Sequence, residues 1–129
     1  MSPTFLTLEE VLLVHCDQLD RYGGEEGIRD MDVLRSALAM PQAGAGGEYF
    51  HDDLFEMAAA YLYHLVQNHA FVDGNKRVGT TAALVFLDMN GVEVGADDAS
   101  LVELVLGVTT GRVSKADVAS FLRRNALGA

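Results

Sequence analysis

Apolar residues recur at helical spacing in several stretches of the chain, and short polar or glycine-rich segments separate these stretches. In the first stretch Leu8, Val11, Leu12, His15 and Leu19 fall on one face of a helix. Read in this way, the pattern predicts helices over about residues 8–22, 31–40, 54–68, 75–89, 98–110 and 115–124. We expect an all-α protein of six or seven helices.

Residues that cap helix ends support these boundaries. Side-chain oxygens that accept a hydrogen bond from the first turn are favoured at a helix start. Glycine, or a proline just beyond, is favoured at a helix end. The expected start signals are capping boxes at Thr7/Glu10 and Ser114/Asp117, and single caps at Asp30, Asp52 or Asp53, and Asp97 or Asp98; the stop signals are Gly23-Gly24, Pro41, Asn90-Gly91 and Gly111.

Two of the predicted helices lie at the centre of the fold. Residues 54–68 are apolar almost all round, which is typical of a helix buried within a bundle. Residues 75–89 are apolar on two sides, and Gly79 within them indicates a close crossing with the preceding helix. Residues 41–49 are rich in glycine and alanine. They form either a plain linker or a flap over the site, and a flap could be a short hairpin that ends at Tyr49-Phe50. Residues 92–94 are at most a short strand.

Composition narrows the class of protein. The 129 residues are sufficient for one domain with its own core, and half of them are hydrophobic. No apolar run reaches the ~18 residues of a membrane span, and residues 1–4 lack the basic start of a signal peptide. Together with the single Cys16, this predicts a soluble cytoplasmic protein. The net charge of −10 argues against nucleic-acid binding.

The most informative stretch is residues 69–77, the loop between the two central helices. Between Arg35 and Arg112 the only cations are Lys76 and Arg77, in the first turn of the second helix. Cations there oppose the partial positive charge of a helix N-terminus. A bound polyphosphate would compensate, since Gly74 allows close approach and the first N–H groups are free. Residues 74–77 are therefore the candidate nucleotide-binding residues.

The same loop carries a metal ligand and a base. Asp73 beside a phosphate site is suited to Mg²⁺, although the same carboxylate could also cap the helix. Asn75 could donate to a phosphate oxygen or cap locally, and Phe71 is expected to anchor the loop in the core. His69 is the nearby group able to take a proton at neutral pH. The residues alone thus predict an Mg²⁺-nucleotide site with a general base, without saying which phosphorus is attacked.

The other histidines have structural explanations. His15 is expected in the core with one hydrogen-bond partner, on the apolar face of the first helix. His51 precedes acidic residues that are better explained as a helix cap than as metal ligands. His64 and His69 are five positions apart and do not share the face that an i,i+4 zinc pair needs.

These residues resemble the Fic/Doc family. His69, Phe71, Asp73, Asn75, Lys76 and Arg77 match every fixed position of the Doc form of the family motif. The resemblance extends from about residue 8 to residue 124, through Arg21-Tyr22-Gly23-Gly24, Gly27-Ile28-Arg29-Asp30 and Asn90-Gly91. Gly74, as in the Fic form, and Val78-Gly79, in place of the Thr-Ala common in Doc-like chains, are departures.

The resemblance implies a compact Fic fold and a transferase that uses ATP and Mg²⁺. His69 would deprotonate a target hydroxyl, Asp73 would hold Mg²⁺, and Gly74, Asn75 and Arg77 would bind phosphates. Family members that transfer AMP typically have glycine where Lys76 stands, and a lysine there would fill the second phosphate pocket. We therefore expect transfer of the γ-phosphate to a protein, as Doc toxins phosphorylate a threonine of elongation factor Tu and arrest translation.

The resemblance also implies regulation by a partner. Many Fic enzymes carry an inhibitory helix in which Ser or Thr stands four residues before Glu, and no glutamate of this chain has that neighbour. We expect inhibition in trans by an antitoxin whose C-terminal segment folds onto the toxin. The alternatives are a Fic-type AMP transferase and a non-catalytic binding module with the same fold.

Overall fold

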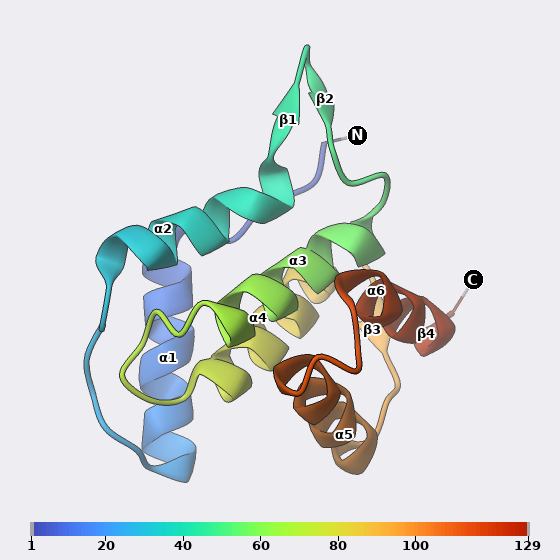
Figure 1. Cartoon of the computed structure of the whole chain (residues 1–129). Coiled ribbons are helices and arrows are strands. Elements are labelled where there is room, and N and C mark those ends of the chain that lie inside the picture. Colours follow the sequence, from blue (N-terminus) through green and yellow to red (C-terminus); the bar gives the residue numbers. More distant parts are fainter. Residues whose placement is uncertain (1, 129) are drawn as a thin grey trace.

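The computed structural model describes residues 2–128, and these residues form an all-helical fold with two small strand pairs (Figure 1). The helices are α1 Leu8–Tyr22, α2 Met31–Ala39, α3 Leu54–Gln67, α4 Asn75–Met89, α5 Asp98–Thr109 and α6 Lys115–Arg124, with a 3₁₀ turn η1 at Met40–Gln42. The strands are β1 Gly44–Ala45, β2 Glu48–Tyr49, β3 Glu93–Val94 and β4 Ala126–Leu127. The expected all-α class is confirmed.

Local capping explains where most of the helices begin. Thr7, Asp30, Asp53, Asp97 and Ser114 each accept a hydrogen bond from a backbone N–H of the first turn. Both predicted capping boxes are present. Asp53 rather than Asp52, and Asp97 rather than Asp98, is the capping residue. Each such cap stabilises a helix by about 1 kcal/mol.

Helix α3 lies at the centre of the fold and packs against α4, α6, α2 and α5 (Figure 1). Its residues 57–62 are buried without interruption, as its apolar sequence predicted. The predicted close crossing at Gly79 of α4 is also confirmed. A Cβ atom at Gly79 would lie 2.8 Å from Val66 Cγ2 and 3.1 Å from the carbonyl oxygen of Leu62.

The described residues form two short strand pairs, and the sequence indicated only one of them. The glycine-rich segment forms an antiparallel hairpin with Gly44 opposite Tyr49, which projects from the helical body (Figure 1). Of the two alternatives for this segment, a plain linker or a flap with a short hairpin, the structure has the hairpin. The pairing of β3 with β4 was not predicted, because two residues at the end of the chain carry no strand pattern of their own. Within residues 2–128, no helix combines the length and apolar character needed to cross a bilayer.

Candidate phosphate-binding site

The loop between α3 and α4 reverses the chain through two residues with left-handed backbones. His69 has φ +50° and Gly74 has φ +82°. Glycine adopts this conformation without steric cost, whereas a residue with a side chain loses about 1–2 kcal/mol. Gly74 is therefore required by its backbone angle, and His69 must be held in place by contacts around it.

Internal hydrogen bonds tie the loop to the start of α4. The Asn75 side chain accepts from the Phe71 N–H at 3.0 Å and donates to the Phe71 carbonyl at 2.9 Å. Two roles were open for Asn75, a bond to a phosphate oxygen and a local cap. In the structure its side chain makes the local bonds, to the backbone of Phe71. Its backbone N–H remains at the helix start.

Beneath the loop, His15 of α1 supports the peptide that joins Asp73 to Gly74. Its Nε2 donates to the carbonyl oxygen of Asp73 at 2.9 Å. Its ring stacks on Phe71 with centroids 4.0 Å apart and planes 13° from parallel. Both side chains are buried. The expected core histidine and the expected anchor Phe71 are thus confirmed, and they contact each other.

Helix α4 begins differently from the others. Among the α-helices within residues 2–128, α4 differs in that its N-cap residue, Gly74, has no side chain to accept a hydrogen bond. Its first turn also holds no acidic residue. The first intrahelical bond is from Val78 N–H to the Gly74 carbonyl at 2.9 Å. The N–H groups of residues 75–77 are therefore available to an anion.

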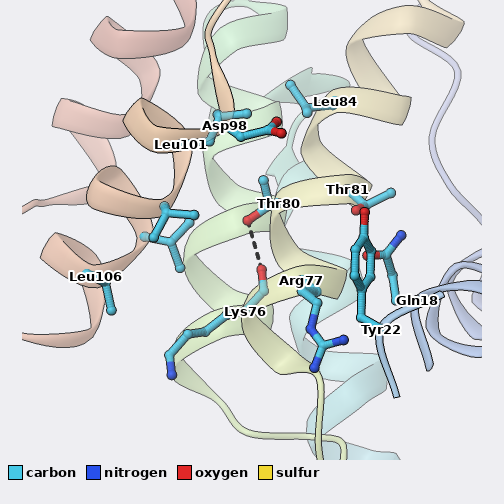
Figure 2. Close-up of a pocket in the computed structure, with 12 residues that line it drawn as sticks. Gln18, Tyr22, Lys76, Arg77, Thr80, Thr81, Leu84, Asp98, Leu101 and Leu106 are labelled. Carbon is cyan, nitrogen blue, oxygen red and sulfur yellow. Dashed lines mark hydrogen bonds between the residues drawn. The ribbon is translucent and has the colours of Figure 1, made fainter. Parts of the chain in front are cut away.

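Both cationic side chains of the first turn extend toward this N-terminal end of α4 (Figure 2). Arg77 donates to the Gly23 carbonyl at 3.3 Å, and its guanidinium lies 5.5 Å from the centre of the Tyr22 ring. Lys76 is exposed, and among the described residues no hydrogen bond or ion pair involves its ammonium. Arg77 is thus oriented by α1, while Lys76 is free to meet a ligand.

Asp73 is held as an ionised carboxylate next to this helix start. One oxygen accepts from the Glu25 N–H at 3.1 Å and the other from the Gly74 N–H at 2.8 Å. These two bonds, in that order of importance, hold the pKa of Asp73 below its usual range, and Arg77 adds a smaller effect. An ionised, partly exposed carboxylate fits an Mg²⁺ ion that takes its other ligands from phosphate and water.

His69 stands at the opposite end of the same loop. Its side chain is exposed, while Ala70 and Phe71 after it are buried. The arrangement therefore presents an imidazole, a carboxylate and an open helix start on one short segment.

A groove of about 500 Å³ runs from Lys76 and Arg77 along α4 (Figure 2). Its far wall consists of α5 side chains, which are apolar apart from Asp98 at the start of that helix. Tyr22 and Gln18 of α1 border the groove on the other side. Val102 and Leu106 on the α5 wall are 58% and 46% exposed. A partly uncovered apolar wall beside two cations indicates a binding surface.

Three contacts of the site were not predicted, those made by His15, the Glu25 N–H and Arg29. Arg29 donates from Nε to the His69 carbonyl at 2.6 Å and from Nη2 to the Asn68 carbonyl at 3.1 Å. Each partner lies at least 39 positions away in sequence, so no local pattern marks these pairs. The polar His15 on an otherwise apolar face was the nearest signal.

The fold and the site define an all-helical protein in which an uncapped, cationic helix start and an exposed histidine belong to one loop. Comparison with known proteins identifies the family. The model of the Fic/DOC family matches residues 5–87. The chain is 39% identical over 116 residues, 90% of each chain, to "Protein kinase doc" of Escherichia phage P1. It is 47% identical over 76 residues, 59% of this chain and 58% of the relative, to "Toxin Doc" of Mycolicibacterium smegmatis.

The chain therefore belongs to the Fic/DOC family.

Proposed function

We propose that this chain is a Doc-type toxin, a protein kinase that transfers the γ-phosphate of ATP to a hydroxyl of a protein. The observation that carries the proposal is the uncapped start of α4, which combines free N–H groups with Lys76 and Arg77. The Asp73 carboxylate lies next to it, bonded to the Gly74 N–H. The relative from phage P1 is named a protein kinase.

In the proposed reaction each loop residue has one task. Lys76, Arg77 and the N–H groups of residues 75–77 would hold the phosphates. Asp73 would hold Mg²⁺, which would supply positive charge to the phosphate oxygens. His69 accepts the proton of the target hydroxyl as its oxygen bonds to the γ-phosphorus. The bond from that phosphorus to the bridging oxygen breaks, and ADP leaves.

Lys76 is the reason to favour the γ-phosphate over AMP transfer. Its side chain adds a positive charge where AMP-transferring relatives, by the resemblance, have glycine and a second phosphate pocket. With Thr80 one turn further on, α4 offers no second arginine for that pocket. The target that the resemblance implies is a threonine of elongation factor Tu, whose modification would arrest translation.

The test is incubation of the purified protein with a cell extract, and with purified elongation factor Tu, using ATP labelled at either the γ or the α position. We expect γ label, and no α label, on one protein. His69→Ala should lower labelling at least 100-fold while keeping the helical circular dichroism spectrum. Label from the α position would instead identify an AMP transferase, and equal labelling by His69→Ala would contradict the role of His69.

We further propose that an antitoxin inhibits this activity by placing its C-terminal segment in the groove between α4 and α5. The apolar α5 wall suits the apolar face of an amphipathic helix, and an acidic residue of that helix would pair with Lys76 or Arg77. A segment bound there would cover the cations needed for the nucleotide. The antitoxin would then inhibit the toxin by preventing the nucleotide from binding.

A further inference from the structure

The segment between α1 and α2 lies alongside the loop that carries His69. The Val72 N–H donates to the Gly27 carbonyl, and the N–H groups of Arg29 and Asp30 both donate to the Ala70 carbonyl, at 2.8–3.1 Å. Ile28 and Phe71 form an isolated antiparallel bridge. The backbone of Arg29 is therefore fixed against the loop before its side chain makes any contact.

From this position the Arg29 side chain binds both peptide groups that flank the α-carbon of His69. Nη2 donates to the carbonyl oxygen of Asn68, which belongs to the peptide group before that carbon, at 3.1 Å. Nε donates to the carbonyl oxygen of His69, which belongs to the peptide group after it, at 2.6 Å. Together the two bonds restrain both backbone angles of His69.

This restraint matters because His69 has φ +50°, a conformation that a residue with a side chain rarely adopts. Such conformations persist only where the surroundings over-determine them. The guanidinium also lies just after the end of α3, where free carbonyls and the helix dipole favour a cation. A planar donor pair suits two neighbouring carbonyls better than the single ammonium of a lysine does.

We propose that Arg29 is a positioning residue that sets the direction of the His69 imidazole by holding its backbone in the left-handed conformation. The inference rests on the proposed function of His69 as the base. Arg29 is assigned no contact with nucleotide or target. Its loss should therefore slow the chemical step and leave nucleotide binding at α4 unchanged.

The experiment compares Arg29→Met, Arg29→Lys and the control Arg35→Met in the γ-label assay. Arg35 is an exposed arginine of α2, and among the described residues no hydrogen bond or ion pair involves its side chain. We expect Arg29→Met to lower kcat about 10- to 100-fold with an unchanged KM for ATP. Arg29→Lys should fall between this variant and the wild type, and Arg35→Met should match the wild type.

A raised KM with unchanged kcat would overturn the proposal, because Arg29 would then act in nucleotide binding. Unchanged kinetics of Arg29→Met would overturn it too. Should Arg29→Met fail to fold, the comparison of Arg29→Lys with the wild type decides by the same criteria.

A second readout separates this inference from the proposed function. NMR signals of the His69 ring should shift and broaden in Arg29→Met, and not in Arg35→Met, because the ring samples more than one direction. If the wild-type protein labels no target, the kinase proposal fails while the ring signals still decide the positioning role. Identical ring signals in all three proteins would overturn it.

Discussion

His64 and His69 lie five positions apart, and the fold gives their imidazoles different surroundings. His64 is half-buried on α3, and its Nε2 lies 3.2 Å from the Lys115 ammonium. Burial, followed by the charges of Lys115 and His51, lowers the pKa of His64 to about 4. An imidazole with that pKa stays neutral but is a weak proton acceptor, whereas His69 is exposed on the loop.

The lowered pKa of His64 predicts a pH dependence of stability. In the unfolded chain His64 takes up its proton near pH 6.5, while in the folded protein it does so near pH 4. Its contribution to stability is therefore complete above pH 6.5 and is lost as the pH falls to 4. We expect this loss to be about 1–2 kcal/mol, after allowing for solvent screening of the half-exposed ring.

Urea unfolding of the wild type and of His64→Gln at several pH values measures this contribution. The difference in unfolding free energy between the two proteins should change between pH 6.5 and pH 4 and be constant above that interval. A difference that does not depend on pH would contradict the assigned pKa. His51→Gln is the control, since His51 adds only the smallest of the three effects.

At the scale of the element, α4 must leave its start open for a ligand and must also pack closely on α3. Different turns of the helix meet these two requirements. Its first turn is left uncapped and cationic, which costs helix stability unless an anion binds. Its second turn holds Gly79, which lets α3 approach closely. The packing of α4 on α3 therefore keeps the unstable helix start in place.

Replacing Gly79 with alanine should destabilise the protein despite the higher helix propensity of alanine. The added Cβ would stand 2.8 Å from Val66 Cγ2 and 3.1 Å from the carbonyl oxygen of Leu62, so the Val66 side chain or the backbone of α3 must move. We expect a net loss of about 1–2 kcal/mol in unfolding free energy, the overpacking cost less the propensity gain. Asp88→Ala, at an exposed position of the same helix, is the control and should change stability by no more than about 0.5 kcal/mol. A stabilised Gly79→Ala variant would show that the crossing is looser than described.

At the scale of the whole molecule, charge is distributed unevenly. The chain carries a net charge of −10, yet Lys76 and Arg77 stand together at one end of the α4–α5 groove. An acidic surface disfavours non-specific contact with nucleic acid, while this local positive region still attracts phosphate. The groove next to it has a mainly apolar wall, so the cations would bind the nucleotide and the wall would bind the antitoxin segment.

A charged residue on the α5 wall should separate activity from inhibition. We expect Val102→Asp to weaken binding of the antitoxin about 10- to 100-fold, because the partner would bury an unpaired carboxylate. The γ-label activity should remain, so co-expression with the antitoxin would no longer prevent growth arrest. Calorimetric titration with the antitoxin measures the affinity.

Leu13→Asp is the matched control for this variant. Leu13 is 70% exposed on α1 and does not line the groove, so its replacement should leave antitoxin affinity unchanged. Equal antitoxin affinity of Val102→Asp and the wild type would show that the antitoxin binds another surface.

The sequence by itself determined the helices and the chemistry of the loop. Helix starts depend on residues within one turn, which is why Thr7, Asp30 and Ser114 marked them correctly. The residues proposed to bind phosphate and Mg²⁺ are consecutive, from Asp73 to Arg77, so their convergence needed only the knowledge that a helix begins there.

Only the tertiary structure decided what holds the site in shape. The contacts of His15 with the Asp73 carbonyl, of the Glu25 N–H with the Asp73 carboxylate and of Arg29 with the His69 carbonyl join positions 58, 48 and 40 residues apart. Each of these three bonds has a backbone group as one partner. Every residue has such groups, so the sequence carries no signature of the pairing. The direction of His69 and the α4–α5 groove arise in the same way, from packing between distant helices rather than from any local pattern.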